Sequence, residues 1–383
     1  MKVCYISAYP PMSDSNGYYT KRLERYLKEM GVEVILILPC PFKLKTKIPH
    51  TYLGILNFMD SVRFLKKHTP DLIHIQHNIH TYISTAFHFW LIIGLVSRIL
   101  KIPVIVTAHE ALTAIKRYGL IAKFYYRLMS LLSKMILVHS ENSRKELIRQ
   151  CNIKPSKIFH MPHGFHEVEK NLSYVDFLKN NWGIKGKKII LFFGLVRPDK
   201  GIENLIKAMA LIKDKYKKDN AIALIVGDVR KREGLINRLF QKKDERYYQY
   251  LEQLTREYNL NDMVIFKKMF VPDEQVFSIF ALGDVVVLPY NRAEDSGVLN
   301  IALSVPRPVV ISNVGGIAET LENTGVLVPP KSPESIADAI VKILDDNGFR
   351  KKLLDDYANL YNRLNPKTIA EYHYYFYKNC IMN

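Results

Sequence analysis

The sequence predicts an α/β protein with two Rossmann-like domains, each built on a doubly wound parallel sheet. Short apolar, β-branched runs alternate with helical patterns along both halves, and this alternation favours right-handed crossovers onto parallel strands. A length of 383 residues also exceeds what one ordinary core accommodates. We therefore expect one sheet in each half, with the ligand-binding carboxyl ends of the two sets of strands facing a cleft.

The strands are expected at apolar runs bounded by turn residues. In the first half these runs are Val3–Ser7, Val32–Leu38, Leu72–Ile75, Val104–Thr107, Met135–Val138 and Ile158–Met161. In the second half they are Ile189–Phe193, Ala223–Val226, Val264–Phe266, Val285–Leu288, Val309–Ile311 and Val326–Val328. Helical spacing fills the gaps, and the first helix contains Leu23, Leu27 and Met30 before it stops at Gly31.

Composition sets the expected domain limits. Residues 171–187 are polar, rich in Lys and Asn, and contain Gly183 and Gly186, which is typical of a linker. The N-terminal domain is therefore expected over residues 1–170 and the C-terminal domain over 188–364. Residues 365–383 are predicted to form a helix that packs back on the N-terminal domain, because aromatic side chains crowd it and are costly to leave in water. These are Tyr372, Tyr374, Tyr375, Phe376 and Tyr377.

The net charge of +18 favours contact with phosphates, an anionic membrane surface or nucleic acid. No recognised nucleic-acid-binding module occurs, so no specific nucleic-acid partner is expected. The four cysteines have no Cys-x-x-Cys spacing, so neither a zinc knuckle nor a disulfide framework is indicated. The chain enters a strand at Val3 without a signal-peptide pattern, so we expect a cytoplasmic protein.

Residues 81–100 are apolar enough to suggest a membrane span. His88 and Arg98 interrupt the run, and it leads directly into a strand at Val104. A buried or interface-lying helix is therefore favoured over a spanning one.

The first candidate phosphate site follows the strand that ends at Phe193. Gly194 begins a short turn that presents Arg197 and Lys200 before a helix, at the edge where open α/β sheets bind anionic ligands. The alternative is that two exposed basic residues in a turn have no ligand.

A second candidate follows the strand Val285–Leu288. Ser296 is a good helix N-cap, and the amides of Gly297, Val298 and Leu299 would point at an anion. The alternative is simple capping. Two such sites in one domain favour a diphosphate ligand.

Histidines recur in two runs with three-residue spacing, and one further histidine ends a strand. The runs are His74/His77/His80 and His160/His163/His166. Each run begins in a strand, where residues three apart point to opposite faces, so no metal site is predicted. His109 follows the buried strand Val104–Thr107, from which side chains reach a ligand crevice. A merely hydrogen-bonded histidine is the alternative at that position.

Together these segments resemble GT-B glycosyltransferases of the retaining family 4 type, whose glycosyl transferases group 1 region binds the donor. The likeness rests on the order and spacing of several segments over nearly the whole chain. These are Tyr9–Gly17, Val106–His109, Val138–Ser140, Met161–His166, Phe193–Gly201, Leu224–Asp228 and Pro308–Glu319.

The resemblance implies a role for each candidate residue. His109 would lie beside the transferred sugar, and Glu294 would hold its hydroxyls. The diphosphate would be bound by Arg197, Lys200, Ser296, Gly297, Val298 and Leu299. Asn16 and Gly17 would belong to a loop that faces donor and acceptor. The N-terminal domain would then bind the acceptor and the C-terminal domain the nucleotide sugar, with no metal and no cofactor beyond that co-substrate.

One position departs from the family pattern. The family usually has a second glutamate eight residues after the first, where this chain has Ala302, or Ile301 if one residue is deleted. Neither side chain can hydrogen-bond a ribose.

The sequence therefore predicts a hexosyltransferase that uses a nucleoside-diphosphate sugar. The expected acceptor is a bacterial surface glycan or a lipid-linked intermediate in polysaccharide biosynthesis, handled at the inner face of the cell membrane. A catalytically silent GT-B scaffold and a GT-B sugar-nucleotide epimerase are the alternatives.

Overall fold

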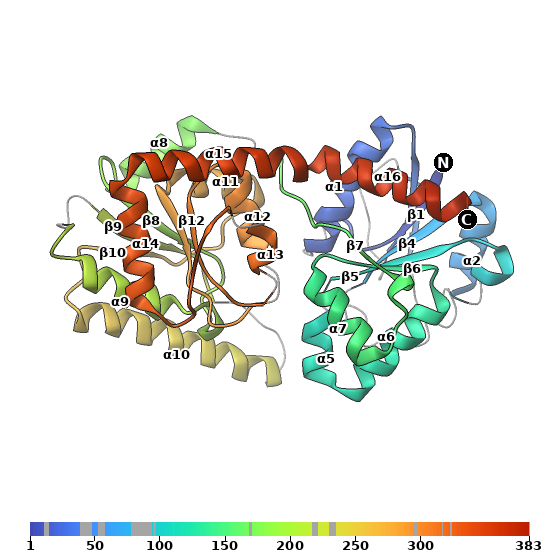
Figure 1. The fold of residues 1–383 in the computed structure, drawn as a ribbon, viewed down its shortest axis with the longest axis horizontal. Coiled ribbons are helices and arrows are strands. Elements are labelled where there is room, and N and C mark those ends of the chain that lie inside the picture. Colours follow the sequence, from blue (N-terminus) through green and yellow to red (C-terminus); the bar gives the residue numbers. More distant parts are fainter. Residues whose placement is uncertain are drawn as a thin grey trace. The chain divides into compact units, whose positions relative to one another are not determined.

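The computed structural model describes residues 1–10, 15–38, 48–52, 58–77, 94, 97–109, 111–167, 171–216, 221–229, 235–293, 297–315, 317–321 and 324–382. The chain divides into two compact units (Figure 1). Unit 1 comprises Met1–Gly164 and Leu364–Asn383, and unit 2 comprises Phe165–Arg363.

Unit 1 contains a seven-stranded, fully parallel sheet in the order β3-β2-β1-β4-β5-β6-β7. Its strands are nearly continuous apolar runs because helices cover both faces of a parallel sheet. The strands are β1 (Lys2–Ile6), β2 (Glu33–Leu38), β3 (His50–Tyr52), β4 (Leu72–His77), β5 (Val104–Ala108), β6 (Met135–Val138) and β7 (Ile158–His160).

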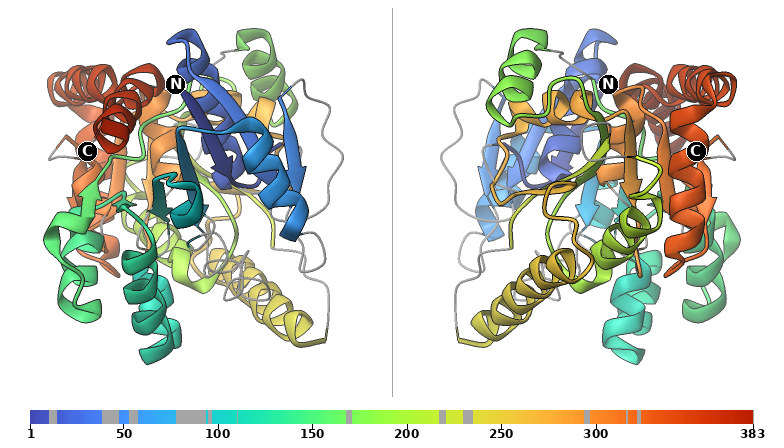
Figure 2. Two further views of the ribbon diagram at one scale, coloured as in Figure 1. Left: turned by 90° about the vertical axis from the view of Figure 1, so that its right-hand side faces the viewer. Right: turned by 90° about the vertical axis from the view of Figure 1, so that its left-hand side faces the viewer.

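The helices of unit 1 form two groups. Helices α5, α6 and α7 pack against one another on one side of the sheet, and α1 packs against α16 on the other (Figures 1 and 2). The described helices are α1 (Ser15–Glu29), α2 (Phe58–His68), α5 (Ala111–Tyr118), α6 (Leu120–Leu132), α7 (Glu141–Cys151) and α16 (Pro366–Met382).

The C-terminal helix α16 is held in unit 1 by buried polar side chains. The Tyr377 hydroxyl lies 2.6 Å from that of Tyr5 and 2.7 Å from Nδ1 of His74. The Tyr19 hydroxyl lies 2.9 Å from Nε2 of His373. Of the aromatic side chains expected to dock this segment, Tyr377 is fully buried, whereas Tyr375 is 64% exposed. A single helix face therefore docks α16, rather than all five aromatic residues.

Unit 2 contains a six-stranded parallel sheet in the doubly wound order β10-β9-β8-β11-β12-β13. The strands are β8 (Lys188–Phe193), β9 (Ala221–Val226), β10 (Val264–Lys267), β11 (Val285–Leu288), β12 (Val309–Ser312) and β13 (Val326–Val328). The described helices are α8 (Leu172–Asn181), α9 (Ile202–Ile212), α10 (Leu235–Glu257), α11 (Asp273–Leu282), α12 (Gly297–Ser304), α13 (Ile317–Leu321), α14 (Pro333–Asp345) and α15 (Asn347–Leu364).

All twelve predicted strands are present in the structure, with ends within two residues of the expected ones. The three-residue strand β3 was not predicted, because His50–Tyr52 is too short and too polar to show an alternating pattern.

The predicted linker over residues 171–187 is wrong. It contains α8, which begins with the Asn171 side chain accepting from the Tyr174 amide and packs on α11 within unit 2. Buried Val175 and Leu178 form the packed face of α8, and the polar residues that suggested a linker lie around it. The chain passes between the units at Gly164–Phe165, instead of at the limits predicted near residues 170 and 188. It returns at Arg363–Leu364, one residue before the predicted limit between 364 and 365.

Candidate active site

In unit 2, the neighbouring strands β8 and β11 mark the point where the sheet order reverses. The chain winds outward from this point in both directions, so the loops after β8 and β11 diverge at their carboxyl ends. Such a switch point is where open α/β sheets bind ligands. Both predicted phosphate-binding segments leave the sheet here.

The loop after β8 carries both predicted cations. The Arg197 guanidinium donates two hydrogen bonds of 2.8 Å to the carboxylate of Asp199, so it is held in a fixed orientation. The Lys200 ammonium lies 4.0 Å from the centroid of the Tyr290 ring. Burial lowers the pKa of Lys200, with Asp199 opposing that shift and Arg197 adding to it. An anion bound here would therefore contact two cations held in fixed positions, Arg197 and the partly buried, poorly hydrated Lys200.

Two glycines, Gly201 in this loop and Gly227 after β9, permit close approach between backbone segments. Gly227 has φ +155°, and a Cβ built on it would lie 1.8 Å from the carbonyl oxygen of Gly194. Gly201 has φ +61°, and its Cβ would lie 2.1 Å from the carbonyl oxygen of Pro289. Only glycine permits such close backbone approach in these conformations.

The loops after β8 and β11 are joined by hydrogen bonds. The Asn291 amide donates to the Asp199 carbonyl over 2.9 Å, and its side-chain amide donates to the Pro198 carbonyl over 3.0 Å. A Cβ built on Gly194 would lie 3.7 Å from Cγ2 of Val298, in the first turn of α12. The structure therefore places Gly194, at the start of the loop that carries Arg197 and Lys200, beside the first turn of α12.

Helix α12 is described from Gly297 to Ser304. Gly297 is exposed, Val298 is half-buried and Leu299 is buried. Glu294 and Ser296 lie outside the described residues. Ala302 is fully buried, so the place expected for a second glutamate is occupied by a packed methyl group.

In unit 1, the predicted loop residues lie at the start of α1, next to the end of β1. Asn16 is buried, and its carbonyl accepts from the Thr20 hydroxyl over 2.9 Å. A Cβ built on Gly17 would lie 3.1 Å from the backbone nitrogen of Tyr9. The absence of a side chain at Gly17 lets α1 approach the β1 loop closely.

His109 directly follows β5 and is half-buried at the same sheet edge. Its Nε2 lies 2.7 Å from Oε1 of Gln76 on β4. Burial lowers the pKa of His109 well below its usual value, and the neighbouring histidines, His139 first, lower it further. His109 is therefore a neutral imidazole at pH 7, able to donate or accept a hydrogen bond but carrying no charge.

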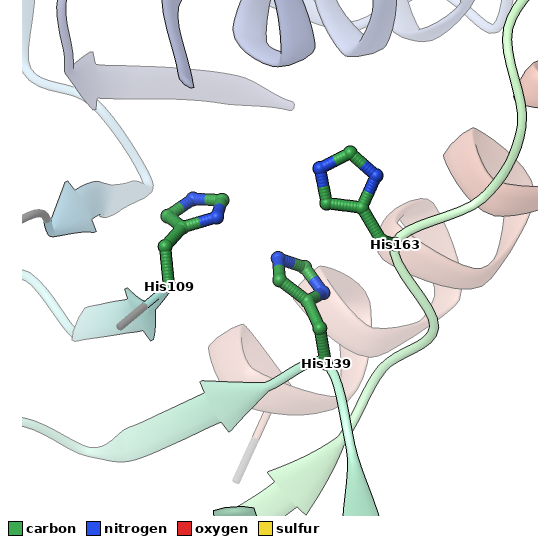
Figure 3. A group of neighbouring side chains, drawn as sticks. All are labelled: His109, His139 and His163. Atoms are coloured by element: carbon green, nitrogen blue, oxygen red, sulfur yellow. The ribbon is translucent and has the colours of Figure 1, made fainter. Parts of the chain in front are cut away.

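Two further histidines join His109 (Figure 3). His139 follows β6, and His163 lies three residues after β7. The ring centroids of His109 and His139 are 4.8 Å apart, and those of His139 and His163 are 4.9 Å apart. The Tyr19 ring is tilted against the His163 ring with their centroids 4.8 Å apart, and it contacts His109 and His139 edge-on. The ends of three successive strands thus supply one histidine cluster, defined here as His109, His139 and His163.

The sequence did not predict this cluster. The two three-residue runs divide in the structure: His74 and His77 are buried, with the Tyr125 hydroxyl 2.7 Å from Nε2 of His77, and His80 lies outside the described residues. Only His163 of the second run joins the cluster. The available signal was that a histidine lies within three residues after each of three consecutive strands, which becomes informative once β5, β6 and β7 are known to be neighbours.

Helix α6 presents an apolar face to solvent. Leu120, Ile121 and Phe124 are 81%, 77% and 63% exposed, and Lys123 and Arg127 lie on the same helix. Among the residues that the structure describes, no helix combines the length and apolarity needed to span a bilayer. The predicted 81–100 helix lies largely outside the described residues.

Two family models match the chain. Residues 17–167 match the family described as Glycosyltransferase Family 4, and residues 175–359 match Glycosyl transferases group 1. Together they cover both units and nearly all of the chain, in the order that the motifs predicted. The chain belongs to the GT-B glycosyltransferases of the family 4 type. The predicted fold class and family are thereby confirmed.

Individual relatives are distant from this glycosyltransferase. The alpha-D-kanosaminyltransferase of Streptomyces kanamyceticus is 26% identical over 281 residues, which cover 70% of this chain and 67% of that one. An uncharacterised glycosyltransferase of Methanocaldococcus jannaschii is 28% identical over 248 residues, covering 62% of this chain and 58% of its own length. The crystal structure of Anabaena HepE with UDP and glucose has a TM-score of 0.75 at 17% identity, covering 99% of this chain and 100% of that one. This last likeness concerns the fold.

Proposed function

We propose that this glycosyltransferase moves a hexose from a nucleoside-diphosphate sugar to an acceptor hydroxyl, with retention of anomeric configuration. The observation that carries the proposal is that the loop after β8, which carries Arg197 and Lys200, lies beside the first turn of α12 at Gly194 and Val298, at the β8/β11 switch point. The presence of UDP and glucose in the HepE structure supports a uridine-diphosphate donor.

In the proposed reaction, the bond between the anomeric carbon and the diphosphate oxygen breaks, and the acceptor oxygen forms a new bond to that carbon. The acceptor proton passes to the departing diphosphate. Negative charge builds on the diphosphate as it leaves, and Arg197, Lys200 and the amides of residues 297–299 stabilise it electrostatically. These groups take the place of a metal at the diphosphate.

His109 is proposed to orient the transferred sugar. Its neutral ring suits hydrogen bonding to sugar hydroxyls, because it can donate or accept without the desolvation cost of a charge. Glu294 is proposed to hold further hydroxyls, and Asn16 and Gly17 to line the loop beside donor and acceptor.

The diphosphate assignment is tested with the double variant Arg197→Ala and Lys200→Ala. Loss of transition-state donors of this kind lowers turnover by about 10²-fold or more. The matched control is Lys351→Ala with Lys352→Ala, which removes two exposed charges from α15 in the same unit. Turnover with a panel of sugar nucleotides is measured for all three proteins, together with the thermal shift each nucleotide causes. Equal turnover in the site variant and wild type would contradict the assignment.

The packed methyl of Ala302 favours one other function, a catalytically silent scaffold that binds nucleotide without transfer. A donor that raises the unfolding temperature but is neither transferred nor hydrolysed would support the scaffold. The anomeric configuration of any product, read by NMR, tests retention.

The acceptor is proposed to be a lipid-linked glycan reached at an anionic membrane surface. The exposed apolar face of α6, with basic residues beside it, supports this, since each basic residue near anionic lipid contributes about 1 kcal/mol. Co-sedimentation with phosphatidylglycerol vesicles should fall several-fold in Ile121→Ser with Phe124→Ser. Phe270→Ser is the control, because Phe270 is 80% exposed but belongs to unit 2. Equal loss in both would show non-specific adhesion.

A further inference from the structure

The histidine cluster has the donor set of a metal centre. Each ring offers one nitrogen, and these three nitrogen atoms all lie within 4.8 Å of one another. The rings come from three separate strand ends and surround a shared space (Figure 3). Imidazole is the commonest protein ligand for transition metals, and three histidines with one open position form a known zinc coordination pattern.

Hydrogen bonds direct two of these rings in the way that ligand histidines require. Nε2 of His109 lies 2.7 Å from the side-chain oxygen of Gln76, so it donates there and leaves Nδ1 with the lone pair. Nδ1 of His139 lies 2.8 Å from the Met161 carbonyl oxygen, so it donates and leaves the lone pair on Nε2. Metal-binding histidines typically donate their other N–H to such an oxygen, which fixes both the tautomer and the ring orientation.

The geometry is close to what a zinc ion needs. Zn–N bonds of about 2.0–2.1 Å in a tetrahedron place the nitrogens about 3.4 Å apart, so small ring rotations would close the site. The Arg22 guanidinium lies 5.8 Å from the centroid of the Tyr19 ring, which packs against the three histidines. Its charge opposes a bare dication, so we expect the fourth ligand to be an anion such as hydroxide.

We propose that His109, His139 and His163 bind one Zn²⁺ ion. A bound ion would engage the lone pair of His109, so the sugar could no longer be oriented by that ring. Zinc would therefore inhibit transfer, a consequence that rests on the proposed function. The site differs from the diphosphate site in residues, in unit and in the sign of the ligand charge.

Binding is tested on the full chain after treatment with a chelator, with Zn²⁺ or Co²⁺ alone as the probe. We expect one zinc per chain by calorimetry, and visible absorption bands of tetrahedral Co²⁺ that added zinc displaces. His139→Gln and His163→Gln should each weaken zinc binding by at least about tenfold. His68→Gln, on α2, is the control and should bind as the wild type does. Circular dichroism of each variant verifies that it is folded.

The proposal is overturned if the folded wild type does not bind zinc, or if His139→Gln and His163→Gln bind it as tightly as His68→Gln. A zinc-independent role for the cluster, such as holding an anion or simply packing, gives these outcomes. Transfer is measured separately with and without zinc. If the protein binds zinc but catalyses no transfer under any condition, the proposed metal site stands and the proposed transferase function is refuted. If it catalyses transfer but binds no zinc, the proposed function stands and the metal site is refuted.

Discussion

The strand-end edges of the two units have the same geometry but opposite chemistry. At the edge of unit 2, Arg197 and Lys200 stand beside a helix start, and glycines let the loops approach closely. At the edge of unit 1, the groups are aromatic rings: the histidine cluster around Tyr19, with His74 and His373 buried behind it. Eleven of the twelve histidines belong to unit 1, and His166 alone belongs to unit 2.

This difference shows how one sheet plan can present two kinds of surface. A parallel sheet supplies a set of strand ends, and the loop residues decide what binds there. Fixed positive charge and backbone amides suit a diphosphate. Neutral, oriented imidazoles suit hydroxyl groups or a transition metal. Two substrates of unlike charge can therefore be divided between two copies of one architecture.

The largest expected difference between the units is in their stability at acidic pH. Burial lowers the pKa of His77 and of His373 to about 3, and that of His74 and His109 well below the usual value. In the unfolded chain these groups titrate near pH 6.5, so above that pH both states are neutral and the stability is fully present. As the pH falls below 6.5, these histidines bind protons in the unfolded chain but stay unprotonated in the folded one, so the folded state loses stability. Between pH 6.5 and 5, His77 and His373 each then lower the free energy of unfolding by about 2 kcal/mol.

Amide hydrogen exchange of the chelator-treated protein measures this effect separately in each unit. After correction for intrinsic rates, peptides from residues 1–164 should lose protection at pH 5 before those from 165–363. Simultaneous loss in both units would contradict the contrast.

The next largest effect is expected in unit 2 from Gly227→Ala. The new Cβ would meet the Gly194 carbonyl at 1.8 Å, and backbone on both sides leaves little room to yield. We expect a loss of about 3 kcal/mol or more. Gly183→Ala is the matched control, since Gly183 has φ +66° but open space around its Cβ position. It should lose only about 1 kcal/mol, the strain of the backbone alone. Urea denaturation measures both, and equal losses would show that the close approach contributes nothing.

A smaller effect is expected in unit 1 from Tyr377→Phe. The lost hydroxyl lies within hydrogen-bond distance of both Tyr5 and His74, which are fully buried. Leaving such groups without a partner costs about 1–3 kcal/mol. Tyr375→Phe removes the same atom from an exposed side chain on the same helix, and should change the unfolding free energy by less than about 0.5 kcal/mol. If both variants unfolded alike, the buried network would have no stabilising role.

The sequence predicted the sheets better than it predicted the sites. Apolar runs such as Val285–Leu288 and Met135–Val138 gave strands with the observed ends, because a buried parallel strand is apolar along its whole length. Strand order did not follow from local pattern. The histidine cluster depends on that order, and so it was missed, although His109 was correctly placed after its strand.

Local composition also misled where a helix is mostly exposed. The polar surface of α8 is indistinguishable from a linker until its packing on α11 is known. Similarly, the pairing of Arg197 with Asp199 depends on the turn bringing them side by side, and residue spacing alone did not reveal it.

The smallest effect on stability is expected from Gly297→Ala, which distinguishes glycine that shapes a loop from glycine that admits a ligand. A Cβ at this position would meet nothing within 4 Å, and the residue begins helix α12. The free energy of unfolding should therefore stay within about 0.5 kcal/mol of wild type. If the amides of this turn hold a diphosphate, the added methyl group would crowd it, since close backbone approach to a ligand is a role of glycine. We then expect UDP to bind about 3- to 10-fold more weakly by calorimetry, with magnesium omitted. Unchanged UDP affinity would place the diphosphate elsewhere than at the start of α12, and would leave Arg197 and Lys200 as the groups to test.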